Sequence, residues 1–260
     1  MHVKSYEKNK RKWKECLRAA ENLLFPPRCP VCDKPVPIVP VRPIVPFGPK
    51  KTELICPGCK NKLVPIGEQV CFYCGKPLPE EEELCSGCRK ERPLYKRGRA
   101  LYSYDSAAAS IYRFKYGGKR EYAIFFGREM ARELEDFICR VNPDGLVPVP
   151  LSDRRLRTRG YNQAALLAEE IGRRTGIPVY SRLVRRIRDT KPQKGLNAKE
   201  RQNNLKKAFK IAQNDVKLST IIIIDDIYTT GSTVNAVAKV LLEVGVREVY
   251  YMALAIGEGY

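Results

Sequence analysis

Four cysteine pairs with one spacing constrain the first part of the chain more than any other feature. Each pair has the form Cys-x-x-Cys, and the cysteines are Cys29, Cys32, Cys56, Cys59, Cys71, Cys74, Cys85 and Cys88. Two such pairs can surround one tetrahedral ion with four thiolates, which closes the site and makes it structural. The sequence therefore predicts two structural zinc ions between residues 28 and 92. A set of disulfides or redox-active cysteine pairs is the alternative.

The spacing alone leaves the pairing of the four motifs open. Pairing in chain order closes the smallest loops and is mildly favoured by loop-closure entropy, and a crossed arrangement is the alternative. Cys16 and Cys139 stand outside the motifs. We expect these two to be small buried hydrophobic residues.

Length and charge restrict the class of protein. The chain has 260 residues, of which 43% are hydrophobic, so it can bury a full core. Its longest apolar run, 249–256, is far shorter than the roughly 20 residues of a membrane-spanning helix, and no secretion signal is evident. We expect a cytoplasmic protein, with the inner face of the membrane as an alternative place. A net charge of +19 favours polyanionic partners, such as nucleic acid, phosphorylated small molecules or an anionic membrane surface.

The pattern of apolar residues predicts three regions: an amphipathic basic helix within 1–27, the cysteine module at 28–92 and an α/β domain at 93–260. In the α/β domain we expect strands at 99–104, 146–150, 179–187, 206–212, 220–224 and 247–256. Helices are expected at 106–116, 120–140, 162–174 and 233–244. Four consecutive isoleucines, Ile221 to Ile224, are typical of a central parallel strand that is buried on both faces. Alternating strands and helices predict a parallel sheet flanked by helices.

The residues after the isoleucine strand have the composition of an anion site. Two acids are followed by a turn with four hydroxyl side chains: Asp225, Asp226, Thr229, Thr230, Gly231, Ser232 and Thr233. Backbone N–H groups at a helix start bind anions, and ligands of open α/β sheets lie at the carboxyl ends of strands. We therefore expect residues 229–233 to hold a phosphate and the two acids to hydrogen-bond sugar hydroxyls. An ordinary turn with a helix cap is the alternative.

Three further segments are rich in cations, and two of them also contain aromatic rings. Segment 151–163 carries Arg154, Arg155, Arg157 and Arg159 and ends in Arg-Gly-Tyr-Asn-Gln, and segment 186–193 carries Arg186 and Arg188. The four arginines of the first segment suit a polyphosphate clamp, with a solvated basic loop and a helix cap at Asn162 as the alternative. For the second segment, a long surface loop that touches nothing is the alternative to a role at the site. Segment 112–118 interleaves tyrosines with cations, which suits base stacking and core packing equally.

Together, these segments resemble the ComF family, competence-associated proteins that join an N-terminal zinc module to a type I phosphoribosyltransferase-like domain. The resemblance covers roughly residues 28–256. It implies a phosphoribosyltransferase-like sheet after a double zinc ribbon, with 229–233 as the phosphoribosyl pyrophosphate loop and Mg²⁺ at the pyrophosphate. It also implies Asp225 and Asp226 as the catalytic and ribose-binding pair. The six arginines would bind pyrophosphate or a DNA backbone, and 182–210 would form a closing loop.

Three hypotheses of function follow from the resemblance and the charge. The first is a DNA-uptake factor that binds single-stranded DNA and phosphoribosyl pyrophosphate, with a DNA translocase and a recombination mediator as partners implied by the resemblance. The second is an active phosphoribosyltransferase on an unidentified acceptor. The third is a scaffold that docks such partners through the zinc ribbons and helix 5–25. No segment identifies an acceptor base, and we therefore expect the first.

Overall fold

The computed structural model describes residues 26–36, 54–187, 208–212 and 218–257. The predictions for helix 5–25, Cys16 and Arg188 lie outside the described residues. The chain divides into two compact units, Met1–Lys62 and Leu63–Tyr260, and each is described by itself. Of the helices in the described ranges, none is long and apolar enough to cross a membrane.

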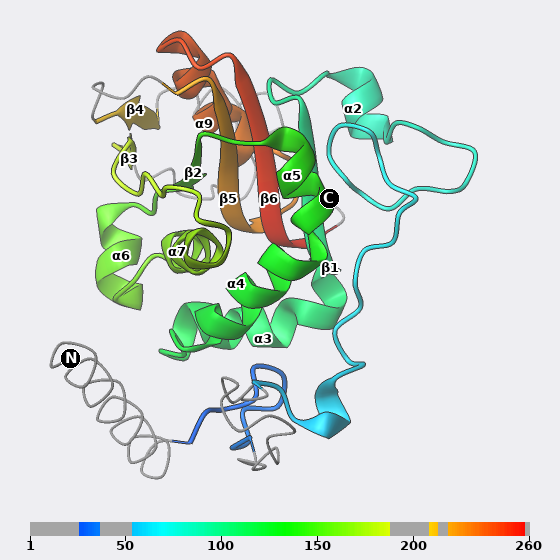
Figure 1. Ribbon diagram of the computed structural model, residues 1–260, viewed down its shortest axis with the longest axis vertical. Helices are drawn as coiled ribbons and strands as arrows, with labels where there is room; N and C mark the ends of the chain where they lie inside the picture. The colour runs from blue at the N-terminus through cyan, green and yellow to red at the C-terminus, as the bar shows by residue number, and fades with distance from the viewer. Residues whose placement is uncertain (1–25, 37–53, 188–207, 213–217, 258–260) are drawn as a thin grey trace, which may run out of the picture. The chain divides into compact units, whose positions relative to one another are not determined.

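The larger unit is built on a four-stranded parallel sheet (Figure 1). Its strand order is β1-β6-β5-β2, with β1 at Arg97–Ser103, β2 at Gly145–Pro148, β5 at Thr220–Tyr228 and β6 at Glu248–Ile256. The isoleucines at 221–224 are fully buried in β5, because the strand lies between two neighbours and under helices on both faces. The prediction of a central parallel strand is confirmed.

Helices cover both faces of this sheet. In Figure 1, α4 (Tyr122–Glu133), α5 (Glu135–Val141) and α7 (Gln163–Thr175) lie in front of the sheet, and α9 (Ser232–Glu243) lies behind it. Helix α3 (Tyr104–Tyr116) follows β1 directly and contacts both β1 and β6. The predicted α/β architecture, a parallel sheet flanked by helices, is confirmed.

The prediction of a single helix at 120–140 is wrong, since the segment forms two helices, α4 and α5. Leu134 separates them with φ −107° and ψ 19°, and its N–H donates to the carbonyl of Met130. The break coincides with burial of Phe137 and Ile138 in α5. Cys139, which we expected to be buried, is exposed on the same helix.

Two predictions at the carboxyl edge of the sheet also need correction. The strand expected at 179–187 is limited to β3 (Val184–Arg186), which pairs with β4 (Phe209–Ile211) in a separate antiparallel ribbon. The segment that we treated as an arginine-rich loop forms a short helix, α6 (Asp153–Arg159). Local signals explain this helix, because the Ser152 hydroxyl accepts from the N–H of Arg155 and Gly160 ends the helix at φ +76°.

Candidate functional site

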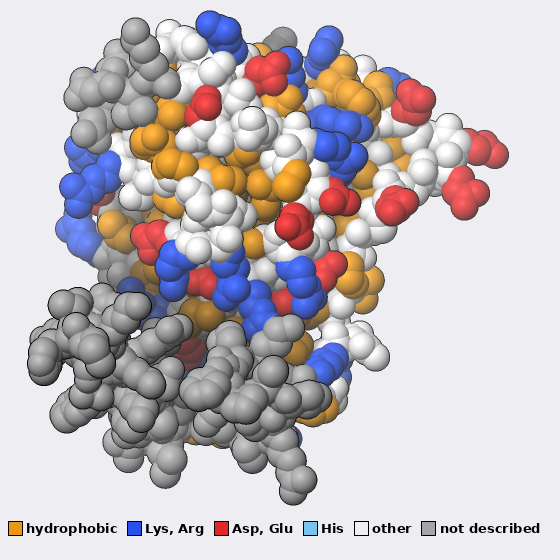
Figure 2. Space-filling view, in the orientation of Figure 1, with side chains coloured by type: hydrophobic (Ala, Val, Ile, Leu, Met, Phe, Trp, Pro, Cys, Tyr) orange, Lys and Arg blue, Asp and Glu red, His pale blue; other side chains and the backbone are white. Residues whose placement is uncertain are grey.

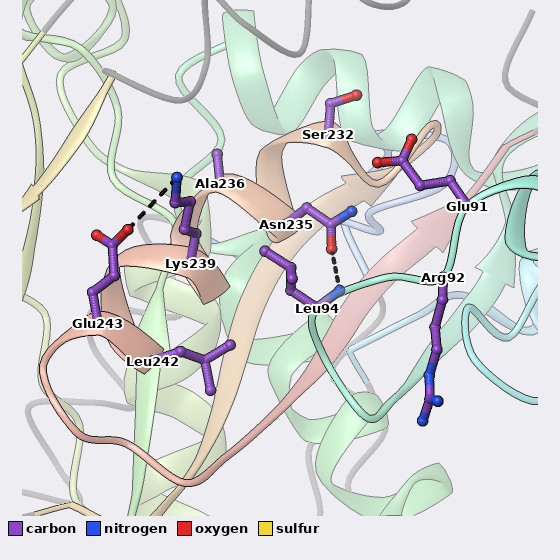
Figure 3. Close-up of a pocket in the computed structure, with 9 residues that line it drawn as sticks. All are labelled: Glu91, Arg92, Leu94, Ser232, Asn235, Ala236, Lys239, Leu242 and Glu243. Atoms are coloured by element: carbon purple, nitrogen blue, oxygen red, sulfur yellow. Dashed lines mark hydrogen bonds and ion pairs between the residues drawn. The ribbon is translucent and has the colours of Figure 1, made fainter.

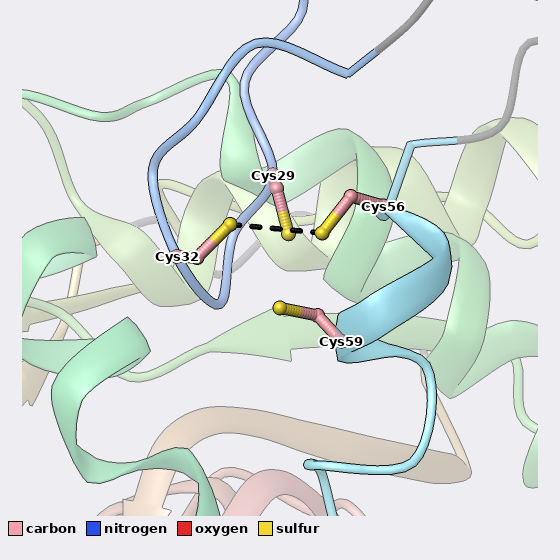
Figure 4. Close-up of side chains that lie close together, drawn as sticks. All are labelled: Cys29, Cys32, Cys56 and Cys59. Atoms are coloured by element: carbon pink, nitrogen blue, oxygen red, sulfur yellow. Dashed lines mark hydrogen bonds between the residues drawn. The ribbon is translucent and has the colours of Figure 1, made fainter.

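The first four-cysteine group lies in the smaller unit and is shown in Figure 4. The sulfur atoms of Cys29, Cys32, Cys56 and Cys59 lie within 4.8 Å of one another, and those of Cys32 and Cys56 are 3.6 Å apart. A tetrahedral zinc ion with Zn–S bonds of about 2.3 Å needs sulfur atoms about 3.8 Å apart. The side chains therefore fit zinc without rearrangement of the turns.

The second group, Cys71, Cys74, Cys85 and Cys88, meets the same test in the larger unit. Its sulfur atoms also lie within 4.8 Å, and those of Cys74 and Cys85 are 3.5 Å apart. A short helix, α2 (Ser86–Lys90), begins after Cys85 and carries Cys88. The four motifs therefore pair in chain order, and each group of thiolates would hold one structural zinc ion.

The second zinc ribbon packs into the core of the α/β unit. The hydroxyl of Tyr251 on β6 donates to the carbonyl of Cys74 at 2.5 Å, and the N–H of Gly98 on β1 donates to the carbonyl of Tyr73 at 2.7 Å. Cys71, Cys74 and Cys88 share one buried cluster with Tyr251. The ribbon around this second centre therefore shares hydrogen bonds and a buried core with the sheet. The domain bounds 1–27, 28–92 and 93–260 stay predictions.

Asp225 and Asp226 form a buried acidic pair within β5. Each residue is only 9% exposed. The strand does not end before them as expected, because its pairing with β6 continues from Asp225 opposite Ala253 to Ile227 opposite Ala255. Lys115 of α3 forms an ion pair with Asp226, with its Nζ 3.0 Å from Oδ1 of that residue. The N–H of Asp226 donates to Oδ1 of Asp225 at 2.8 Å.

The environment of Asp225 favours its neutral form. Burial, followed by the charge of Asp226, raises the pKa of Asp225 to about 7, although the N–H of Asp226 and the charges of Lys115 and Arg186 oppose this change. At neutral pH, this carboxyl group can therefore accept or donate a hydrogen bond to a sugar hydroxyl. It could also take up or release a proton.

The turn after β5 presents the hydroxyl groups that the sequence places there. Thr229 and Thr230 are exposed, and Oγ1 of Thr230 is 2.8 Å from Oγ of Ser232. Gly231 adopts φ +76° and immediately precedes α9. Since the first N–H groups of a helix have no partner within it, the start of α9, including Thr233, offers donors for an anion.

The arginines of α6 occupy different positions from one another. Arg159 is anchored, because it donates to Oε1 of Gln163 at 3.0 Å and to the hydroxyl of Tyr116 at 3.1 Å. Arg154 and Arg157 lie on the exposed side, and Arg155 is half-buried. Figure 2 shows basic side chains along the edge where α6 lies, far from the acidic tip near residues 80–83.

The pocket beside the carboxyl end of β2 takes its cations from another element. A pocket of about 620 Å³ is lined by Pro150 and Leu151 and by Arg182, Arg185 and Arg186 at β3. Arg186 also acts electrostatically on Asp225. The structure thus brings Arg186 toward the acidic pair, while the α6 arginines do not line this pocket.

The exposed rings of α3 decide between two interpretations of segment 112–118. Tyr112 is 66% exposed and Tyr116 is 58% exposed, with ring centroids 5.1 Å apart. The guanidinium of Arg159 lies 4.9 Å from the Tyr116 ring centre. Core packing is therefore excluded for both tyrosines, and the rings form a solvent-facing pair beside a cation.

A second pocket, of about 550 Å³, lies on the outer side of α9 (Figure 3). Leu94, Ala236 and Leu242 supply its apolar surface, while Asn235 accepts from the N–H of Leu94 at 2.9 Å. It shares Ser232 with the hydroxyl-rich turn but includes neither aspartate. The pocket is therefore separate from the acidic pair.

Comparisons with known proteins agree with this architecture. A double zinc ribbon domain model matches residues 20–89, and a phosphoribosyl transferase domain model matches residues 172–257. The chain is 32% identical over 211 residues to Competence protein F of Haemophilus influenzae, covering 77% of this chain and 90% of that protein. The chain belongs to the ComF family. Within this family it is also 32% identical over 207 residues to Competence protein ComFC of Bacillus subtilis, covering 75% of this chain and 81% of the relative. It is 31% identical over 204 residues to the DNA utilization protein YhgH of Escherichia coli, covering 77% and 89%.

The expected fold of this ComF-family chain is therefore confirmed, namely a phosphoribosyltransferase-like parallel sheet with a double zinc ribbon. Sequence reasoning missed Lys115 as the partner of Asp226 and missed Arg182 and Arg185 as pocket residues. Lys115 lies in segment 112–118, where the alternation of cations and rings drew attention to the segment but did not indicate Asp226 as a partner. Both arginines belong to segment 182–210, which the resemblance assigns to a closing loop, but the sequence did not indicate that they line a pocket beside β2.

Proposed function

We propose that this chain is a DNA-uptake factor that binds single-stranded DNA and a phosphoribosyl pyrophosphate-type ligand. Relatives that are named competence proteins and match over most of their length support the competence role. The observation that carries the proposal is the position of α3. Its neighbouring residues Lys115 and Tyr116 engage Asp226 and Arg159, so one helix joins the acidic pair to the arginine helix.

The sugar-phosphate half of the proposal uses the carboxyl end of β5. Asp225 and Asp226 hold the ribose hydroxyls, and the turn at 229–233 holds the 5-phosphate at the start of α9. Mg²⁺, when bound with the ligand, neutralises pyrophosphate charge. Arg186 of β3, which lines the pocket beside β2, contributes cationic charge on the pyrophosphate side.

The DNA half of the proposal uses the exposed face of α3 and α6. Aromatic rings bind single-stranded DNA by stacking on bases, and cations beside them attract the phosphates. Tyr112 and Tyr116 supply exposed rings, and Arg154, Arg155, Arg157 and Arg159 supply charge on the adjoining helix. A DNA translocase and a recombination mediator are the protein partners that the family resemblance suggests for this role.

Transferase turnover is the second candidate function. It is favoured by the buried Asp225, whose pKa is raised to about 7 by burial and by Asp226. In that reaction an acceptor would form a bond to C1 of the ribose, and the bond to pyrophosphate would break. Release of pyrophosphate from phosphoribosyl pyrophosphate and Mg²⁺, measured across an acceptor panel, distinguishes turnover from binding alone.

The test measures both ligands on the full chain. Calorimetry with phosphoribosyl pyrophosphate and Mg²⁺ should show binding that weakens at least tenfold in Asp226→Asn, since the variant loses a carboxylate at the ribose. The matched control Asp144→Asn changes an exposed aspartate at the other end of the sheet and should bind like the wild type. Fluorescence anisotropy should show single-stranded DNA binding at low salt.

The two halves of the proposal can be rejected separately. Absence of binding to phosphoribosyl pyrophosphate with Mg²⁺ would reject the sugar-phosphate half, as would equal affinities for Asp226→Asn and the wild type. Absence of anisotropy change with single-stranded DNA at low ionic strength would reject the DNA half.

A further inference from the structure

Three buried tyrosines lie between the second four-cysteine site and the hydroxyl-rich turn. Tyr95 precedes β1, Tyr228 ends β5 and Tyr251 lies in β6, and all three are at most 5% exposed. They belong to the same buried cluster as Cys71, Cys74 and Cys88. Tyrosines this deeply buried call for a structural or functional reason.

One end of this tyrosine cluster contacts the metal-binding turn. The hydroxyl of Tyr251 donates to the backbone carbonyl of Cys74 at 2.5 Å. Cys74 is one of the four thiol residues of the second centre. The position of this ligand's backbone is therefore coupled to the position of the Tyr251 ring.

Within the cluster the rings are in direct contact. Tyr228 stacks on Tyr251 with ring centroids 4.6 Å apart and planes 7° from parallel. Tyr95 packs edge-on against Tyr251 at 5.0 Å, and its hydroxyl lies 2.6 Å from that of Tyr228. Each ring is thus fixed by packing and, for Tyr95 and Tyr228, by a shared hydrogen bond.

The other end of the cluster supports the turn. Tyr228 is the residue directly before Thr229, and a Cβ atom on Gly231 would lie 2.4 Å from the Tyr228 hydroxyl oxygen. The backbone of the turn therefore rests on this hydroxyl, at a residue with φ +76°. A displacement of the Tyr228 ring would move the turn, because close-packed interiors transmit displacement.

We propose that Tyr95, Tyr228 and Tyr251 are positioning residues through which the zinc-loaded second ribbon holds the phosphate-binding turn in shape. The effect on ligand binding rests on the proposed sugar-phosphate binding. The coupling between the ribbon and the turn is a property of the protein without ligand. Because coupling between two sites is reciprocal, a ligand at the turn also stabilises the ribbon. The second zinc centre then acts on ligand binding as well as on folding.

Hydrogen exchange read by mass spectrometry on the full, zinc-loaded chain tests the coupling without any ligand. Cys85→Ser removes one thiolate of the second centre. We expect amide exchange in 228–234 to become severalfold faster in this variant, while exchange in α7 stays at the wild-type rate. Cys56→Ser, which removes the equivalent thiolate of the first centre, is the matched control and should leave 228–234 unchanged. Unchanged exchange in 228–234 in Cys85→Ser, or an equal increase in α7, would overturn the proposal.

A second pair of variants keeps both zinc centres intact. Tyr251→Phe removes only the hydroxyl that bonds Cys74, and Tyr250→Phe removes a neighbouring hydroxyl that donates to Glu248 at 2.8 Å. We expect faster exchange in 228–234 and in 71–88 for Tyr251→Phe alone. Equal behaviour of the two variants would overturn the role of the tyrosine cluster.

Ribose 5-phosphate added to the same samples separates this inference from the proposed function. Protection of 228–234 together with 71–88 in the wild type, with protection of 71–88 lost in Tyr251→Phe, supports both. Protection of 228–234 alone in the wild type overturns the coupling and leaves the proposed binding intact. No protection of 228–234 contradicts the proposed sugar-phosphate binding, and the ligand-free comparisons above then decide the coupling.

Discussion

Two aspartates at opposite ends of β5 experience opposite environments. Asp225 is buried beside Asp226, and its pKa is raised to about 7 by that burial and by the neighbouring charge. Asp144 lies at the other end, where its carboxylate accepts from the N–H groups of Thr220 at 2.8 Å and Ser219 at 2.7 Å. These hydrogen bonds lower the pKa of Asp144 below its ordinary value. Ionisation of Asp144 therefore stabilises the fold, whereas ionisation of Asp225 destabilises it.

The pH dependence of thermal unfolding should reveal this difference. For Asp225 the folded pKa lies above the unfolded value, so its contribution to stability is complete below about pH 4 and is lost as pH rises to about 7. Raising a pKa from 3.8 to about 7 corresponds to about 4 kcal/mol, which is an upper limit for a pair that shares its charge. Asp225→Asn should therefore melt at a higher temperature than the wild type, by a margin that grows between pH 4 and pH 7.

Asp144→Asn provides the control with the opposite sign. In the wild type the pKa of Asp144 is lowered by folding. The stabilisation that this carboxylate contributes is therefore present above about pH 4 and is lost as pH falls through the lowered pKa. This variant should melt below the wild type at pH 7, with a margin that shrinks in acid. A margin for Asp225→Asn that does not change with pH would contradict the environment described for Asp225.

Residue identities at the site could be predicted from the sequence, but their partners could not. Asp225 and Asp226 follow four isoleucines, and this local pattern indicates the carboxyl end of a buried strand. Lys115 belongs to α3, and its contact with Asp226 depends on how that helix crosses the sheet. Such contacts between distant segments have no signature in either segment alone.

At the scale of elements, the connection from β5 to α9 depends on one glycine. Gly231 has φ +76°, which residues with a Cβ adopt at a cost of about 1 kcal/mol. Gly176 at the end of α7 has the same φ of +76°, and nothing lies within 4 Å of a Cβ built there. The two glycines therefore share the backbone strain of a substitution and differ in the contact with Tyr228.

Alanine at these two positions should separate strain from contact. Gly176→Ala should lower the free energy of unfolding by about 1 kcal/mol. Gly231→Ala should cost about 1 to 3 kcal/mol more, because its Cβ would meet the Tyr228 hydroxyl at 2.4 Å. Chemical denaturation measures both, and adding Tyr228→Phe should recover part of the additional cost. Equal costs for the two alanine variants would mean that the turn does not rest on Tyr228.

Local end signals make α6 predictable from the sequence, whereas the break between α4 and α5 has no such signal. Ser152 and Gly160 are the cap residues of α6, and the high density of arginine between them led us to expect a loop instead. The break at Leu134 has no comparable signal, since no glycine or proline lies there. It reflects the packing of Phe137 and Ile138, which is a tertiary effect.

At the scale of the whole molecule, the repeated cysteine motifs conceal a difference between the two zinc ribbons. The sequence treats them as one module, and both groups fit a zinc ion. The second ribbon nevertheless shares a buried cluster with β5, β6 and α9, through side chains such as Tyr251. The apolar run at 249–256 predicts a buried strand that includes Tyr251, but it does not indicate that a metal-binding turn packs against this residue.

The net charge of +19 is a property of the whole chain. The contribution of charge to DNA binding can be measured separately from the contribution of bases stacking on the exposed rings. Each phosphate neutralised on a single strand contributes about −0.7 to the slope of log affinity against log salt concentration. Arg157→Gln on α6 should therefore make this slope less steep by about 0.7. Tyr112→Ala removes a ring that is 66% exposed, and it should lower affinity about fivefold or more while leaving the slope unchanged.

Arg247→Gln is the matched charge control, because Arg247 is exposed just before the amino end of β6, whereas α6 follows the carboxyl end of β2. This variant makes the same change in net charge. It should alter the slope little, because salt at 0.1 M screens an exposed charge from phosphates that lie more than about 10 Å away. Fluorescence anisotropy titrations of a labelled single strand between 50 and 200 mM salt would measure all three variants. Equal slope changes for Arg157→Gln and Arg247→Gln would mean that the strand is attracted by net charge alone. A changed slope in Tyr112→Ala would mean that the ring positions a phosphate contact rather than a base.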